Sequence, residues 1–214
     1  MKNKKKLVAA MISNCVFYKN NRLGYIDQLK KHIDVDLYGK CGKGLQCPPQ
    51  NENKNISSHS ESEECFKYLG ENYKFYLSFE NCNCEDYITE KFFMNGLSYG
   101  MIPIVMGPSK ENYEQVAPNL GKSFIHVDDF ENPKDLAEYL LSLDKNESLY
   151  QEYFDWRKKE EWILSWDGTE DLLCRICGML YYSDFRPPSP WPSVNTEFIN
   201  VTKCAKIGSW HWKL

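Results

Sequence analysis

A polar stretch separates two apolar segments in the middle of the chain. The first segment, 75–79, ends at Glu80, and the second opens with Thr89-Glu90-Lys91. This pattern predicts a buried strand, a polar loop and a helix, and ligands bind in open α/β sheets where strands give way to helices. Lys91 would lie in the first helical turn, where the helix dipole and free N–H groups also favour an anion. Position makes Lys91 a candidate phosphate ligand, whereas the base rate for exposed lysines favours an ordinary solvated lysine.

Two further polar residues follow the first apolar run of the chain. Residues 7–12 form a short apolar run that is typical of a buried parallel strand, and Ser13 and Asn14 come directly after it. Their side chains could contact the same anion as Lys91, or they could cap the turn that follows the strand.

Short apolar runs alternate with segments of helical spacing along the chain. We expect strands and helices in alternation, with strands at 7–12, 35–38, 73–79, 102–106 and 123–127, and helices at 21–33, 89–100, from 132 and over 148–162. The segment 39–70 shows no periodicity and is expected to be a surface excursion. Such alternation implies an α/β fold with a Rossmann-like parallel sheet, here over residues 1–166. Residues 167–214, rich in proline and cysteine, are expected to form an extended tail pinned by disulfides.

Composition narrows the class of protein. A length of 214 residues suits one domain or slightly more. The net charge of -4 argues against a general nucleic-acid binder. The sequence contains no run of about 18 apolar residues, so it predicts no transmembrane helix.

Cysteines and glycosylation motifs indicate where the protein folds. The nine cysteines and three N-glycosylation sequons favour an oxidising, secretory-pathway lumen. The sequons begin at Asn55, Asn146 and Asn200. The odd number of cysteines leaves at least one thiol free or paired outside the chain.

Sequence position suggests some of the cysteine pairings. Within 39–70, Cys41 is expected to pair with Cys47 or Cys65. Cys82 and Cys84 are too close in sequence to suit each other, so a distant partner or a free thiol is expected there.

Two patterns resemble metal-binding motifs. Asp128-Asp129 is an acidic pair, but it precedes Asn132-Pro133, a strong helix start, so a turn or cap role is favoured. Cys174-x-x-Cys177 could bind zinc, yet zinc needs four ligands and only Cys204 and His211 are near in sequence. A structural disulfide within this tail is the better interpretation, and we predict no metal site.

The motif F-x-L-x-F-E-N, followed by D-Y-I-T-E-K, resembles the donor-binding signature of the α1,3-fucosyltransferases of glycosyltransferase family 10. Other motifs follow in the family's order, at 12–15, 22–25, 35–41, 100–108, 111–114, 123–130 and 155–157. The resemblance implies the C-terminal, donor-binding half of a GT-B glycosyltransferase. It further implies inverting transfer of L-fucose from GDP-fucose to GlcNAc of a glycoprotein glycan, with no cofactor beyond this donor and no nucleic-acid partner.

The same resemblance assigns roles to individual residues. Lys91 and Arg22 would hold the diphosphate, since a guanidinium binds phosphate in a bidentate way. Glu90 would lie near the fucose or the ribose, and Asn81 and Tyr87 would complete the donor site. Each has an ordinary alternative: a first-turn arginine, a helix-dipole partner, a loop-amide acceptor and a core tyrosine.

The resemblance also implies parts that this sequence is expected to lack. These are the N-terminal acceptor domain, which would supply the general base, and the stem and membrane anchor that place relatives in the Golgi. A truncated, non-catalytic GDP-sugar-binding remnant is the alternative function. The runs 35–41 and 174–177 are similar to core-type members, which modify N-glycans, more than to Lewis-type members.

Overall fold

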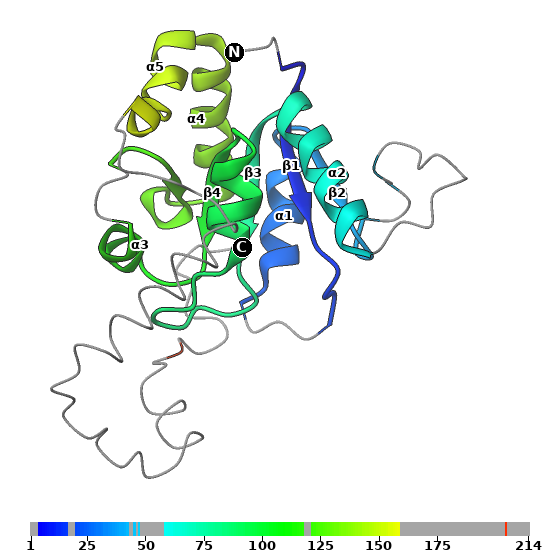
Figure 1. Cartoon of the computed structure of the whole chain (residues 1–214). Coiled ribbons are helices and arrows are strands. Elements are labelled where there is room, and N and C mark those ends of the chain that lie inside the picture. Colours follow the sequence, from blue (N-terminus) through cyan, green and yellow to red (C-terminus); the bar gives the residue numbers. More distant parts are fainter. Residues whose placement is uncertain are drawn as a thin grey trace, which may run out of the picture.

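The computed structural model describes residues 4–16, 20–42, 45, 47, 58–117, 121–158 and 204. Within them, five parallel strands form a sheet in the order β2-β1-β3-β4-β5 (Figure 1). The strands are β1 (Lys6–Met11), β2 (Val35–Tyr38), β3 (Tyr73–Phe79), β4 (Ile102–Met106) and β5 (Ile125–His126). The predicted α/β fold with a Rossmann-like parallel sheet is confirmed.

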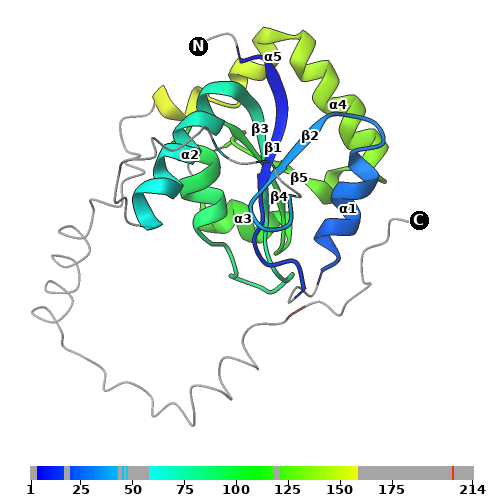
Figure 2. The ribbon, with the colours of Figure 1, turned by 90° about the vertical axis from the view of Figure 1, so that its right-hand side faces the viewer.

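Helices cover both faces of the sheet (Figure 2). One face carries α1 (Arg22–Leu29), α4 (Pro133–Lys145) and α5 (Glu147–Glu152). The other carries α2 (Ser58–Asn72), the π-helix η1 (Lys91–Ser98) and α3 (Lys110–Val116). Two short 3-10 turns, η2 (Val127–Asp129) and η3 (Asp155–Lys158), complete the described elements.

The central strand β3 is buried on both sides, which explains its almost unbroken apolar sequence. Phe75, Leu77 and Phe79 face α1 and α4, whereas Tyr76 packs against α2. Each of these four side chains is almost completely buried, and burying a large apolar side chain contributes about 1.5–3 kcal/mol. The carboxyl end of β3 is therefore held firmly by the core.

A helix replaces the second part of the expected surface excursion. Residues 58–72 form α2, and Cys65, Phe66 and Leu69 lie at helical spacing against Ala9 and other residues of the sheet. The apolar stripe is narrow and the other positions are mostly polar, so the sequence pattern did not predict the helix. The prediction of an excursion over 39–70 was wrong for this part.

Two of the disulfides among the described residues differ from the expected cysteine pairings. Cys41 pairs with Cys15, because β1 and β2 run in parallel and the loops at their carboxyl ends lie together. Cys65 of α2 pairs with Cys47. The expected pairing of Cys41 with Cys47 or Cys65 was therefore wrong.

The third disulfide joins Cys84 to Cys204, 120 positions apart. It confirms the distant partner expected for Cys84, and it ties residue 204 of the predicted tail to the loop after β3. Cys174, Cys177 and the rest of segment 167–214 lie outside the described residues, as do Asn55 and Asn200. Asn146 is exposed and caps α5, with Oδ1 accepting from the Leu149 N–H at 3.2 Å.

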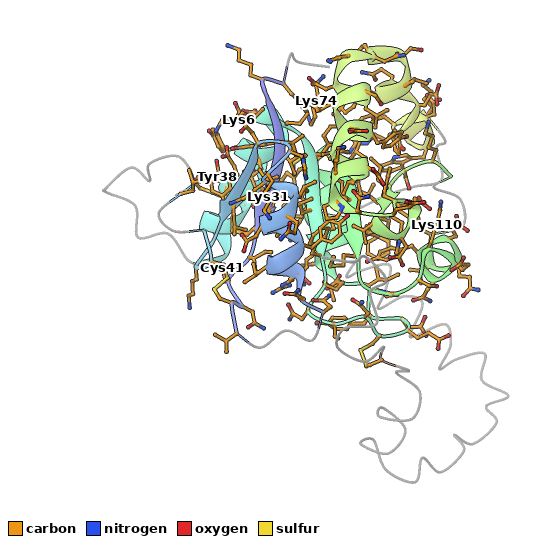
Figure 3. The ribbon with its side chains drawn as sticks, turned by 180° about the vertical axis from the view of Figure 1, so that it is seen from behind. Lys6, Lys31, Tyr38, Cys41, Lys74 and Lys110 are labelled. Atoms are coloured by element: carbon orange, nitrogen blue, oxygen red, sulfur yellow. A yellow bond between two sulfur atoms is a disulfide. The ribbon has the colours of Figure 1, made fainter. Side chains whose placement is uncertain are left out.

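A polar network joins β1 and β2 to β3. Lys6 Nζ donates to Asp36 Oδ2 and to the Tyr73 hydroxyl, both at 2.9 Å, and the hydroxyls of Tyr38 and Tyr73 lie 2.8 Å apart. Figure 3 shows Lys6 and Tyr38 on the β2 side of the sheet. These contacts hold the edge strand β2 to the sheet. None of the described helices combines the length and the apolar character that crossing a membrane requires.

The start of α4 follows the sequence prediction. Asn132 Oδ1 accepts from the backbone N–H groups of Lys134 and Asp135, at 2.9 and 3.1 Å, and Pro133 occupies the first turn. We expect Asn132→Ala to lower the free energy of unfolding by about 1 kcal/mol, because the cap is lost. Urea unfolding followed by circular dichroism measures this.

Ser142→Ala is the matched control for the cap, since Ser142 is exposed later in α4 and donates only to the Tyr139 carbonyl. Its unfolding midpoint should stay close to that of the wild type. Equal midpoints for Asn132→Ala and the wild type would contradict the capping role.

Candidate functional site

The sheet has a topological switch point between β1 and β3. The chain turns from β1 to β2 on one side, and the later strands follow on the other side of β1. In open α/β sheets ligands bind at the carboxyl ends of the strands where the order reverses. The loops that follow β1 and β3 begin at Ile12 and Glu80, so both end at this position.

A fully buried carboxylate lies at the end of β3. Glu80 has 0% exposure of its side chain. Glu80 Oε1 accepts hydrogen bonds from the Thr89 backbone N–H at 2.9 Å and from the Thr89 hydroxyl at 2.8 Å. Glu80 Oε2 lies 3.2 Å from Lys91 Nζ. The carboxylate therefore fastens both ends of the loop 80–91, which we call the donor loop.

Lys91 lies at the C-terminal end of this loop. Its ammonium lies 2.8 Å from Thr89 Oγ1 and 3.1 Å from Glu90 Oε1, in addition to Glu80, and the side chain is 18% exposed. Burial lowers the pKa of Lys91, but the charges of Glu80 and Glu90 outweigh burial and raise it. Lys91 is therefore cationic at neutral pH.

Glu90 is the more exposed of the two carboxylates that contact Lys91. Its side chain is 51% exposed. Burial raises the pKa of Glu90, whereas the Lys91 charge and hydrogen bond bring the net shift downward. Glu90 is therefore an ionised group at the open side of the site, as its predicted role requires.

Arg22 and Asn14 meet beneath the donor loop. Arg22 Nη1 donates to the Phe79 carbonyl at 2.9 Å, Nη2 donates to the Asn14 carbonyl at 3.0 Å, and Arg22 is only 2% exposed. In this structure the guanidinium joins the carboxyl ends of β1 and β3. Ser13 is exposed at the same edge.

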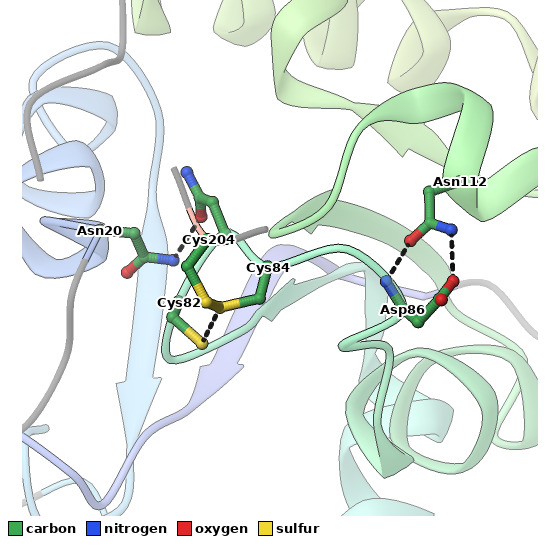
Figure 4. The surroundings of a disulfide bond; sticks show 7 residues. Asn20, Cys82, Cys84, Asp86, Asn112 and Cys204 are labelled. Carbon is green, nitrogen blue, oxygen red and sulfur yellow. Dashed lines mark hydrogen bonds between the residues drawn. A yellow bond between two sulfur atoms is a disulfide. The ribbon is translucent and has the colours of Figure 1, made fainter. Parts of the chain in front are cut away.

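Two side-chain clamps and one disulfide fix the donor loop from outside (Figure 4). Asn20 Nδ2 donates to the Glu80 carbonyl and to Asn83 Oδ1, both at 2.9 Å. On the other side, Asn112 Oδ1 accepts from the Asp86 N–H at 2.8 Å, and Asn112 Nδ2 donates to Asp86 Oδ1 at 2.7 Å. The Cys84–Cys204 disulfide lies between these clamps.

The structure brings together most of the predicted site residues. Lys91 and Glu90 are in contact, Tyr87 lies close enough for the Lys91 charge to act on its hydroxyl, and Asn81 is half-buried in the same loop. The helix expected over 89–100 begins at Lys91, and the Thr89 hydroxyl donates to Glu80.

The sequence predictions missed four residues of the site: Glu80, its partner Thr89, Asn20 and Asn112. Asn112 lies in the motif 111–114, which resembled the family, but that resemblance assigned it no role. Asn20 lies among other polar residues before a helix, and neither spacing nor composition distinguishes it.

The acidic pair Asp128-Asp129 is divided between two contacts. Asp129 pairs with Lys110 at 2.8 Å, while Asp128 Oδ2 lies 3.6 Å from His126 Nδ1. Across the described ranges, no three His, Cys, Asp or Glu side chains gather as metal ligands.

Comparison with known proteins agrees with these motifs. The family described as "Glycosyltransferase family 10 (fucosyltransferase) C-term" matches residues 1–192. The Drosophila melanogaster protein named glycoprotein 3-alpha-L-fucosyltransferase A is 44% identical over 194 residues, which are 90% of this chain and 35% of that protein. The Bos taurus protein named 3-galactosyl-N-acetylglucosaminide 4-alpha-L-fucosyltransferase FUT3 is 44% identical over 182 residues, 83% of this chain and 43% of its own.

A solved structure titled as an alpha1,3-fucosyltransferase is 24% identical, with a TM-score of 0.48 over 71% of this chain and 37% of that one. The chain thus spans well under half the length of the curated relatives described above. Because the family match covers most of the sequence, the chain belongs to glycosyltransferase family 10, the fucosyltransferases, and corresponds to the C-terminal part of its members.

Proposed function

We propose that the donor loop binds GDP-fucose and that the protein transfers L-fucose, with inversion, to GlcNAc of a glycoprotein glycan in α1,3 linkage. The observation that carries this proposal is the Lys91 ammonium, held within 3.2 Å of three oxygen atoms at the switch point of a family 10 chain. A fixed cation at this position suits the diphosphate of a nucleotide sugar.

Lys91 would bind the diphosphate and stabilise the charge that develops on it as GDP departs. Its three N–H donors are all directed at protein oxygens in this structure. Glu90 is exposed enough to move aside, which would free one donor for phosphate and leave the Glu90 carboxylate facing the sugar. Arg22 would add positive charge from beneath, and Ser13, Asn14, Asn81 and Tyr87 would complete the donor site.

The relatives support a glycan acceptor but differ in detail. The fly protein is named for a glycoprotein acceptor, and the bovine protein is named for a 4-linked product on a galactosylated GlcNAc. We propose the GlcNAc of the glycoprotein N-glycan core as the acceptor. The disulfides and the exposed sequon Asn146 support a lumenal, Golgi location.

Removal of the Lys91 charge tests donor binding. We expect Lys91→Ala to weaken GDP binding by roughly 10- to 100-fold, since hydrogen bonds to charged groups contribute about 1.5–3 kcal/mol. Isothermal titration calorimetry of the full chain with GDP measures this change.

Lys110→Ala is the control for GDP binding, because Lys110 forms an exposed ion pair with Asp129 outside the donor loop. Its GDP affinity should match that of the wild type. Equal losses in both variants, or no GDP binding by the wild type, would refute the proposed donor site.

A transfer assay tests the reaction. Incubation with GDP-β-L-fucose and an N-glycan ending in GlcNAc should yield an α1,3-fucosylated product, identified by mass spectrometry and NMR, and Lys91→Ala should abolish it. A galactosylated GlcNAc acceptor in parallel compares the Lewis-type alternative. GDP binding without transfer to either glycan would contradict catalysis by this chain and favour a donor-binding remnant.

A further inference from the structure

We propose that Glu80 is a positioning residue: its buried carboxylate orients the ammonium of Lys91 and fixes the donor loop around it. The consequence of this inference for donor binding rests on the proposed function. The interaction between Glu80 and Lys91 itself can be tested without any ligand.

The first argument is that the Glu80 main chain is fixed on both sides. Its N–H donates to the Met106 carbonyl of β4 at 2.8 Å, and its carbonyl accepts from Asn20 at 2.9 Å. The β4–α3 turn packs directly on the side chain, since a Cβ added to Gly107 would come within 3.0 Å of Glu80 Cγ. The carboxylate therefore has one available position.

Both carboxylate oxygens have partners in the loop. Oε1 accepts from the N–H and the hydroxyl of Thr89, whereas Oε2 lies 3.0 Å from the same hydroxyl and 3.2 Å from Lys91 Nζ. The Thr89 hydroxyl also accepts from Lys91 at 2.8 Å, so it links the two charges. A buried carboxylate without such partners would be strongly destabilising, which makes this arrangement obligatory for Glu80.

The second argument concerns which counter-charge remains when an anion binds. Three titratable groups face Lys91 among the described residues: Glu80 from β3, its neighbour Glu90, and Tyr87 from the loop. Glu90 is half-exposed and can turn away, but Glu80 cannot. Glu80 is thus the permanent partner that keeps a largely buried amine protonated.

The variant Glu80→Gln separates the hydrogen bonding of Glu80 from its charge. Glutamine keeps an amide oxygen for Thr89 but removes the charge. Burial lowers the pKa of Lys91, and the charge of Glu80 raises it. Without that charge, the Lys91 pKa should fall. Because only the protonated amine binds a diphosphate well, the alkaline loss of GDP affinity should also move to lower pH.

The test is an NMR titration of the full chain labelled with ¹³C at lysine Cε, the Lys91 signal being assigned by its absence in Lys91→Arg. We expect the Lys91 signal to titrate at lower pH in Glu80→Gln than in the wild type. Asp129→Asn, which removes a carboxylate from the exposed Lys110 pair, should leave it unchanged. Superimposable Lys91 titrations in wild type and Glu80→Gln would overturn the proposal, since a merely structural Glu80 is replaced by glutamine without moving this signal.

GDP affinity measured across the same pH range gives the functional arm. A wild type that binds no GDP defeats the proposed function, whereas the NMR titration still decides the role of Glu80. An affinity curve whose alkaline limb does not shift in Glu80→Gln contradicts the role in donor binding.

A double-mutant cycle of folding stability tests the same pair if the Glu80→Gln variant folds poorly. Lys91→Met leaves the Glu80 charge buried without its ammonium, so it should destabilise the chain more than the same substitution made in a Glu80→Gln background. Equal effects of Lys91→Met in the two backgrounds would show that the pair is uncoupled and would overturn the proposal.

Discussion

A charge buried at the end of the central strand governs the architecture of the site. The Glu80 carboxylate is excluded from water, and burial of an ionised group is unfavourable unless hydrogen bonds and an opposite charge surround it. The chain meets this demand within eleven residues, through the N–H and hydroxyl of Thr89 and the ammonium of Lys91. The shape of the donor loop follows from satisfying this one group.

The sheet supplies the rigid support that this arrangement needs. β3 pairs with β1 on one side and β4 on the other, so the main chain at Glu80 cannot shift without disturbing the core. Asn20 and Asn112 hold the loop from opposite sides, and neither belongs to β3.

The sequence allowed the parallel sheet and the position of Lys91 to be predicted, because both depend on local patterns. Short, largely apolar runs predicted the bounds of β2, β3 and β4 as observed, and the polar break after Phe79 predicted the position of the loop. The helix α2 was not predicted, because its apolar stripe is narrow. The contact between Thr89 and Glu80 was not predicted either, because the two residues lie nine positions apart in the sequence.

Contacts between distant residues lay beyond prediction from the sequence. The partner of Cys41 depends on strand pairing, which places the β1 and β2 loops side by side. Arg22 illustrates the same point: its guanidinium reaches the Asn14 carbonyl in the loop after β1 and the Phe79 carbonyl at the end of β3, 57 positions away. The resemblance to a family identified Arg22 as important, but only the packed fold reveals that it joins β1 to β3.

The Cys84–Cys204 disulfide joins two residues that are synthesised far apart in time. Residue 204 follows Cys84 by 120 positions, so a chain synthesised from its amino end contains the donor loop long before the cross-link partner exists. The five strands of the described sheet end at His126, also well before residue 204. This cross-link can therefore form only after the strands and the loop have been made, and a polypeptide interrupted before residue 204 would contain the whole described sheet but lack the covalent tether of the donor loop.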